Sequence, residues 1–195
     1  MKKKVFSAAL VLLLLALVMG GTLAFFTEDV RTRNVVTTGK VDIELKEFRD
    51  LAMTEAYPAE AVPVAPGTKV TKVVVVENTG ASDAWVRVKV TPTVELSDGT
   101  AGSPACIGLN FDSANWLKDG DYYYYRTPLS NDSAAPALTP PLFDTVTFAG
   151  VMDNAYQGSM AFVSVSAEAV QVKNNNPVSQ LTTHDDVAQI NGWPS

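Results

Sequence analysis

Apolar and polar residues alternate along several short stretches of the chain, and helical periodicity is scarce. Alternation with a period of two is typical of strands that bury one face and expose the other. It is clearest at residues 41–45 and 85–90, and it returns at 143–148 and 160–171. Seven or eight such strands, separated by turns rich in Gly, Pro and Asn, predict an all-β antiparallel sandwich of the jelly-roll type.

Two stretches that lack alternation carry additional information. Residues 73–76 are four consecutive valines, which predicts a strand buried on both faces or covered by a partner. Residues 122–125 are four consecutive tyrosines, and side chains of a strand alternate between its two faces. One tyrosine pair must therefore lie outside the core. Together with Trp116, Tyr122 and Tyr124 are candidate binding aromatics; alternatively, the rings fill the edge of the core while the hydroxyls reach water.

The first 24 residues have the pattern of a secretory signal peptide. Three lysines precede an apolar run over residues 5–19, and small residues follow at 20–24, which is the usual order of signal regions. We predict cleavage between Ala24 and Phe25. An uncleaved anchor is the alternative, because residues 5–26 are long enough to cross a bilayer. On the favoured interpretation the protein is secreted and meets the membrane only through the signal, before cleavage.

The composition of the remaining chain limits its partners. The 171 residues after Ala24 suffice for one domain with a real core, expected at 41–173 and followed by a weakly ordered tail at 174–195. Without the signal lysines the net charge changes from −6 to about −9. Such an acidic surface repels phosphate, so no nucleic-acid partner is expected. Cys106 is the only cysteine, which excludes an intrachain disulfide and predicts a small buried apolar residue.

The segment that cleavage would free, residues 25–40, resembles a donor strand in its pattern. Its apolar positions are separated by polar and charged ones; they are Phe25, Phe26, Val30, Val35 and Val36. Apolar aromatic residues at a new N-terminus need a groove to cover them. A neighbouring subunit's sheet edge would provide one by β-augmentation, and head-to-tail donation would propagate a filament. The alternatives are a first strand within the same subunit, or a remnant of the signal.

Several short motifs, in order along the chain, resemble the TasA/camelysin family of exported bacterial proteins. They lie at residues 20–27, 38–43, 65–72, 77–80, 156–159 and 167–171. The resemblance implies a jelly-roll-like sandwich, cleavage by a signal peptidase of the SipW type, and a place in the biofilm matrix or on the surface of a Gram-positive-type bacterium. In fibre-forming members of the family, the freed N-terminal segment inserts as a strand into the next subunit.

The camelysin name also implies a metallopeptidase, which the residue types do not favour. A zinc peptidase needs two or three histidines in fixed geometry with a carboxylate base, commonly as H-E-x-x-H. The chain has one histidine, His184, next to Asp185 and Asp186. It also lacks the G-x-S-x-G pattern of a serine nucleophile and a complete calcium loop. We therefore expect no catalytic residues, no metal site and no cofactor.

These observations predict a non-enzymatic structural subunit that associates with itself or with another matrix protein. Two alternatives remain open. One is a secreted module that binds a glycan or a protein through exposed Trp and Tyr side chains. The other is a camelysin-like metallopeptidase.

Overall fold

The computed structural model describes residues 26–28, 33–37, 41–58, 62–64, 66–131, 137–150, 156–173, 175 and 178–194. Residues 26–28, 33–37 and 62–64 are described by their backbone alone. The strands are β1 (Phe26–Glu28), β2 (Arg33–Thr37), β3 (Ile43–Phe48), β4 (Val62–Val64), β5 (Lys69–Thr71), β6 (Val73–Asn78), β7 (Ala84–Glu95), β8 (Ala101–Gly102), β9 (Ile107–Leu109), β10 (Trp116–Asp119), β11 (Tyr122–Tyr125), β12 (Thr145–Phe148) and β13 (Met160–Gln171). A 3₁₀ turn, η1 (Pro104–Cys106), and a short helix, α2 (His184–Ala188), complete the described elements. None of the helices in these ranges has the length and apolar character needed to cross a bilayer.

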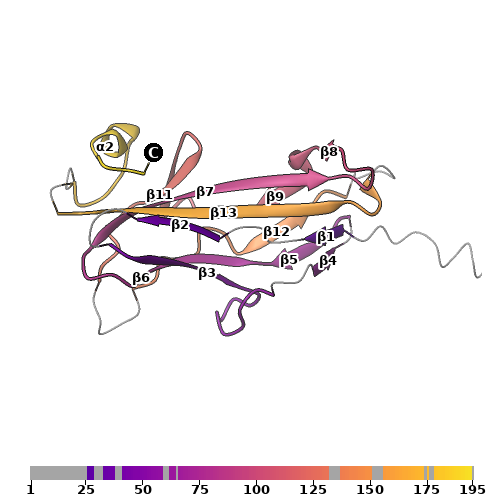
Figure 1. Cartoon of the computed structure of the whole chain (residues 1–195), viewed down its shortest axis with the longest axis horizontal. Helices are drawn as coiled ribbons and strands as arrows, with labels where there is room; N and C mark the ends of the chain where they lie inside the picture. The colour runs from indigo at the N-terminus through magenta and orange to yellow at the C-terminus, as the bar shows by residue number, and fades with distance from the viewer. Residues whose placement is uncertain are drawn as a thin grey trace, which may run out of the picture.

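The larger sheet is built around two long antiparallel strands. β7 and β13 pair over their whole length, from Ala84 opposite Gln171 to Glu95 opposite Met160. The strand order is β10-β11-β7-β13-β1-β4, with β2 also on β13 and β8 also on β7. β1 and β2 run parallel to β13, whereas the other pairs are antiparallel. Figure 1 shows β7 and β13 extending across the length of the molecule.

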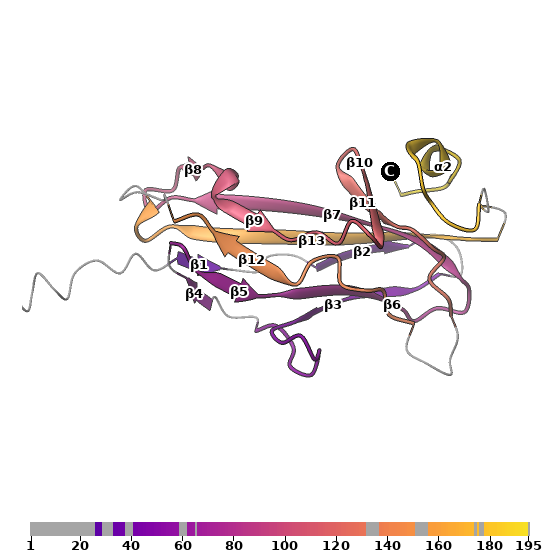
Figure 2. The ribbon, with the colours of Figure 1, turned by 180° about the vertical axis from the view of Figure 1, so that it is seen from behind.

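The second layer consists of two short sheets joined by further backbone hydrogen bonds. β3 pairs with β6, and β12 lies between β5 and β9. The residues just before β12 also form backbone hydrogen bonds with β6 and the residue that precedes it. Lys72 N donates to Asp144 O (2.9 Å), and Leu142 N donates to Val74 O (2.8 Å). Figures 1 and 2 show β3, β5 and β6 of this layer beneath β7 and β13. The predicted all-β sandwich is therefore confirmed.

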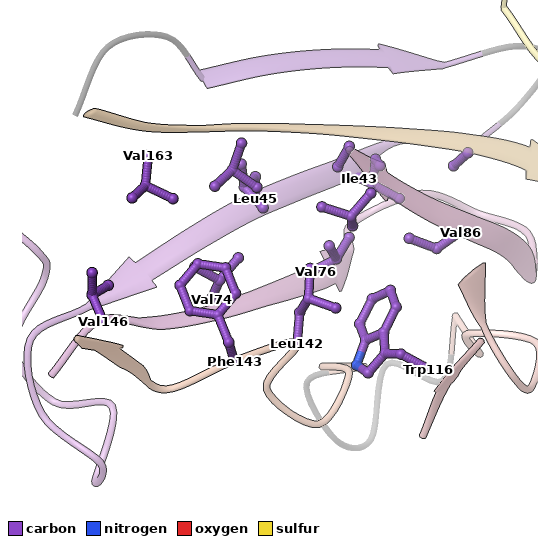
Figure 3. Close-up of a cluster of buried hydrophobic side chains, with 14 of the residues drawn as sticks. Ile43, Leu45, Val74, Val76, Val86, Trp116, Leu142, Phe143, Val146 and Val163 are labelled. Carbon is purple, nitrogen blue, oxygen red and sulfur yellow. The ribbon is translucent and has the colours of Figure 1, made fainter. Parts of the chain in front are cut away.

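The core lies between the two layers and follows the predicted alternation. Every second residue of β13 points inward, and these positions are Ala161, Val163, Val165, Ala167 and Ala169. The small side chains face larger ones from the opposite layer and its loops, including Leu45, Leu142 and Phe143 (Figure 3). Val73–Val76 are all buried, which confirms the prediction for the four consecutive valines.

The C-terminal residues correct one prediction. Residues 178–194 are not weakly ordered but pack on the outer face of the larger sheet, where Leu181, Val187 and Ile190 are buried. We call them the docked C-terminal segment. Its apolar residues are widely spaced in a polar sequence, so no periodic pattern marked them as buried. Thr183 and Asp186 form a capping box that starts α2.

Candidate functional site

The first strands of the chain occupy a slot in the larger sheet. β1 pairs antiparallel with β4, with Phe26 opposite Val64 and Glu28 opposite Val62. On its other side β1 pairs parallel with β13, where Thr27 lies opposite Met160. The backbone of β1 thus has ladder partners on both sides. A strand in such a position forms backbone hydrogen bonds with two neighbouring strands, whereas a strand at the edge of a sheet forms them with only one.

β2 extends the same slot along β13. Its register places Arg33 opposite Val165 and Thr37 opposite Ala169. Together β1 and β2 cover the edge of β13 at residues 160–161 and 165–169. Without them, the backbone groups of this edge would lose their partners, which is unfavourable where water cannot replace them.

Three of the predicted assembly residues lie in these strands. Phe26 is in β1, and Val35 and Val36 are in β2. Phe25 and Val30, like the predicted cleavage site at Ala24 and Phe25, lie outside the described residues. In this structure the segment pairs within its own chain, which is the alternative that the sequence left open.

A second feature is a cluster of aromatic and charged side chains on the outer face of the same sheet. The Arg87 guanidinium lies 4.0 Å from the centre of the Tyr122 ring and 4.4 Å from that of the Trp193 ring. Its Nε donates to Glu168 Oε2 at 2.6 Å, and its Nη1 donates to Tyr124 Oη at 3.3 Å. Burial lowers the pKa of Arg87, but the hydrogen bonds to Tyr124 and Glu168 outweigh it and raise the pKa overall.

The structure changes the interpretation of the predicted binding aromatics. Trp116 is only 2% exposed and lies in the inner core, with its Nε1 donating to Pro140 O, so it offers no surface to a ligand. That prediction is wrong because the strand period places Trp116 on the same face as Tyr125, toward the core. Tyr122 and Tyr124 do point outward. Tyr124, however, is buried against Trp193 of the docked C-terminal segment.

Sequence reasoning missed three residues of the outer cluster: Arg87, Glu168 and Trp193. Arg87 alternates with inward-facing valines, as a solvated residue would, and Glu168 lies in a similar alternating stretch. The two are direct partners across β7 and β13, but strand pairing over 81 positions is not visible in the sequence. Trp193 was the available signal, because a large aromatic side chain in a polar tail needs a site that covers it.

Comparison with known families now identifies the chain. Residues 1–102, more than half of the sequence, match the model of the camelysin metallo-endopeptidases. The chain belongs to the camelysin family. This family includes TasA, so the resemblance inferred from the sequence is confirmed. No curated protein and no solved structure matches the chain.

The described residues of this camelysin-family chain do not fit the zinc site that the family's name implies. The imidazole of His184 is 71% exposed, and its Nδ1 lies 2.8 Å from Asp119 Oδ1. Across the described ranges, no three His, Cys, Asp or Glu side chains gather as a metal site would require. Cys106 is half-buried with a pKa raised by burial, which opposes formation of a nucleophilic thiolate.

Proposed function

We propose that this camelysin-family protein is a secreted structural subunit of the extracellular matrix or cell surface. It assembles by donating residues 25–37 to a neighbouring subunit, after a signal peptidase of the SipW type has cleaved the chain between Ala24 and Phe25. The observation that supports this proposal is the slot itself: β1 lies between β4 and β13, with ladder partners on both sides.

The strand that fills this slot can come from the same chain or from a neighbouring subunit. The slot needs an extended backbone that pairs parallel to β13 and antiparallel to β4. Main-chain bonds of this kind do not depend on which subunit provides the strand, as in other cases of β-augmentation. A strand from the next copy would replace the chain's own, and each copy would in turn donate its own segment. Such a heterologous contact does not close on itself, so it produces filaments.

The chemistry of the described residues supports a structural role over a peptidase. The solvent-exposed His184 is the chain's only histidine, and imidazole ligands are the usual basis of a zinc peptidase site. A second role in glycan binding is not favoured, because Trp116 is in the core and Tyr124 is covered by Trp193.

Truncation tests the proposal. Protein that begins at Phe25 should form filaments, visible by electron microscopy and as a fast-sedimenting fraction. Protein that begins at Asn34 lacks β1 and part of β2 and should remain monomeric. Leu51→Ala, at an exposed residue outside the strands that form the slot, is the matched control and should assemble normally. Filaments of unchanged yield from the Asn34 protein would rule out strand donation.

A further inference from the structure

The outer face of the larger sheet carries a groove with a defined occupant. We call it the Arg87 groove; it is formed by outward side chains of four strands, namely Trp85 and Arg87 of β7, Leu117 of β10, Tyr122 and Tyr124 of β11, and Val170 of β13. The docked C-terminal segment fills it with Leu181, Val187, Ile190 and Trp193. Figure 1 shows α2 and the C-terminus beside β11 and β7, outside the two layers.

The composition of this contact is that of a protein–protein interface. The inner core consists largely of Val, Ala, Leu and Phe. In the groove, the Arg87 guanidinium lies over the rings of both Tyr122 and Trp193, and Tyr124 meets Trp193 edge-on with ring centres 5.7 Å apart. Trp, Tyr and Arg are the residue types that dominate binding energy at interfaces.

Polar contacts fix the position of the segment in the groove. Leu181 N donates to Arg126 O at 2.7 Å, and Arg126 Nη1 donates to Leu181 O at 2.9 Å. At the other side of the segment, His184 lies against Asp119. These bonds join the segment to the β10–β11 hairpin and to the residue that follows it. They specify a register, as a peptide-binding groove does.

When the segment is docked in the groove, a buried hydrogen-bond donor of the segment lacks an acceptor among the described residues. Trp193 Nε1 is buried and finds no acceptor among the described residues. A buried polar group without a partner is unfavourable, because it has lost its hydrogen bonds to water. This cost weakens the docking of the segment to the same extent whichever copy of the chain provides it.

We propose that the Arg87 groove is a docking site for the C-terminal segment of a second copy of this chain. Each contact described above joins residues 178–194 to the body of the protein, so a segment from another copy can make the same contacts. The segment continues from β13 through residues 174–177, which in sequence are three asparagines and a proline. Exchange of such a terminal element is a low-cost route to association between identical chains. This interface uses the opposite end of the chain from the N-terminal strand and is independent of it.

Cross-linking between two differently marked chains tests the proposal. In a Cys106→Ser background, one chain carries Asp119→Cys and the other carries His184→Cys, because these side chains touch in the structure. The two are mixed at high concentration in mild urea, returned to buffer and treated with a short bismaleimide. We expect a covalent heterodimer, identified by mass, at least about fivefold above a control pair of Thr100→Cys with His184→Cys. Thr100 precedes β8, at the far end of β7 from α2 (Figure 1).

Two further samples decide the interpretation. Trp193→Ala in the His184→Cys chain should reduce the heterodimer to the control level, because it removes the anchor in the groove. The single-chain variant Asp119→Cys/His184→Cys reports docking within one chain. If it cross-links internally while the mixed chains stay at the control level, exchange between copies is wrong. Heterodimer that persists with Trp193→Ala would also overturn the proposal. N-terminal donation is tested separately by the Asn34 truncation, which leaves the groove intact.

Discussion

Arg87 and Glu168 form an ion pair across the centre of the larger sheet, directly opposite each other on β7 and β13. The two side chains are 11% and 14% exposed, and the shortest contact, Nη2 to Oε2, is 2.5 Å. Tyr122 Oη donates to the other carboxylate oxygen at 3.3 Å. The pair therefore connects the sheet to the aromatic residues that hold Trp193.

Glu168→Gln should destabilise the protein. It removes the charge that compensates a mostly buried guanidinium, and the loss of one partner from a fully buried pair costs about 3–5 kcal/mol. Because this pair retains some exposure, we expect the free energy of unfolding, measured with urea, to fall by about 2–3 kcal/mol. The double variant Arg87→Met/Glu168→Met should recover part of this loss, since no uncompensated charge remains. A double variant less stable than Glu168→Gln would contradict this account.

Trp193→Ala should loosen the docked C-terminal segment without unfolding the sandwich. The variant removes a cation–π contact with Arg87 and an edge-on contact with Tyr124, together worth roughly 2 kcal/mol. Hydrogen exchange should become faster by tenfold or more at residues 178–194 and remain unchanged in β13. Leu51→Ala, at a residue that is 70% exposed, is the control and should alter neither region. Equal acceleration throughout the chain would show that the segment and the sandwich unfold together.

Acid should release the start of α2. Backbone N–H groups of Thr182 and Thr183, with the Thr182 hydroxyl, lower the pKa of Asp186 to about 2 from its ordinary 3.8. Because the folded pKa lies below the unfolded one, this stabilisation is fully present above about pH 4 and is lost as the pH falls toward 2. Hydrogen exchange at 182–186 should therefore accelerate over that window.

The comparison that isolates Asp186 is the Asp186→Asn variant. Other carboxylates near the docked C-terminal segment, including those of Asp119 and Glu168, are present in both proteins. The difference between the two pH profiles thus reports Asp186 alone. Profiles that run parallel between pH 4 and 2 would show that the charge of Asp186 does not hold the cap.

The sequence predicted the sandwich because strand alternation is a local property. Val86 and Val88 face the core as their spacing requires, and the valines of β6 are buried on both faces. Contacts between distant residues were not predictable in this way. Lys72 is fully buried, with its Nζ 3.4 Å from Glu47 Oε1 and 4.1 Å from the centre of the Tyr57 ring. A lysine between strands is usually exposed, and only the fold brings Glu47 and Tyr57 around it.

The candidate sites were also predictable only where they depend on local sequence pattern. The apolar pattern of residues 25–36 indicated a strand that needs a groove, and β1 and β2 are strands in a slot. The docking of Trp193 on Arg87 was missed because it depends on a chain reversal after β13. Local pattern alone cannot show which face of a sheet a polar tail returns to.

The turn after β6 provides a prediction about the fold itself. Asn78 Nδ2 donates to Ser82 O and Leu129 O, and Asn78 Oδ1 accepts from Gly80 N. A Cβ added to Gly80 would lie 2.5 Å from the backbone nitrogen of Asp42, a distance that no side-chain rotation can relieve.

Gly80→Ala should therefore lower the free energy of unfolding by about 2–3 kcal/mol, in the range of other overpacked sites. Gly99, with φ +81° and open space around it, is the matched control; Gly99→Ala should cost only the roughly 1 kcal/mol of left-handed backbone strain. Equal losses in thermal unfolding would contradict this account, because Gly80, unlike Gly99, does not have a positive φ, and the close approach to Asp42 is the reason given for glycine at position 80.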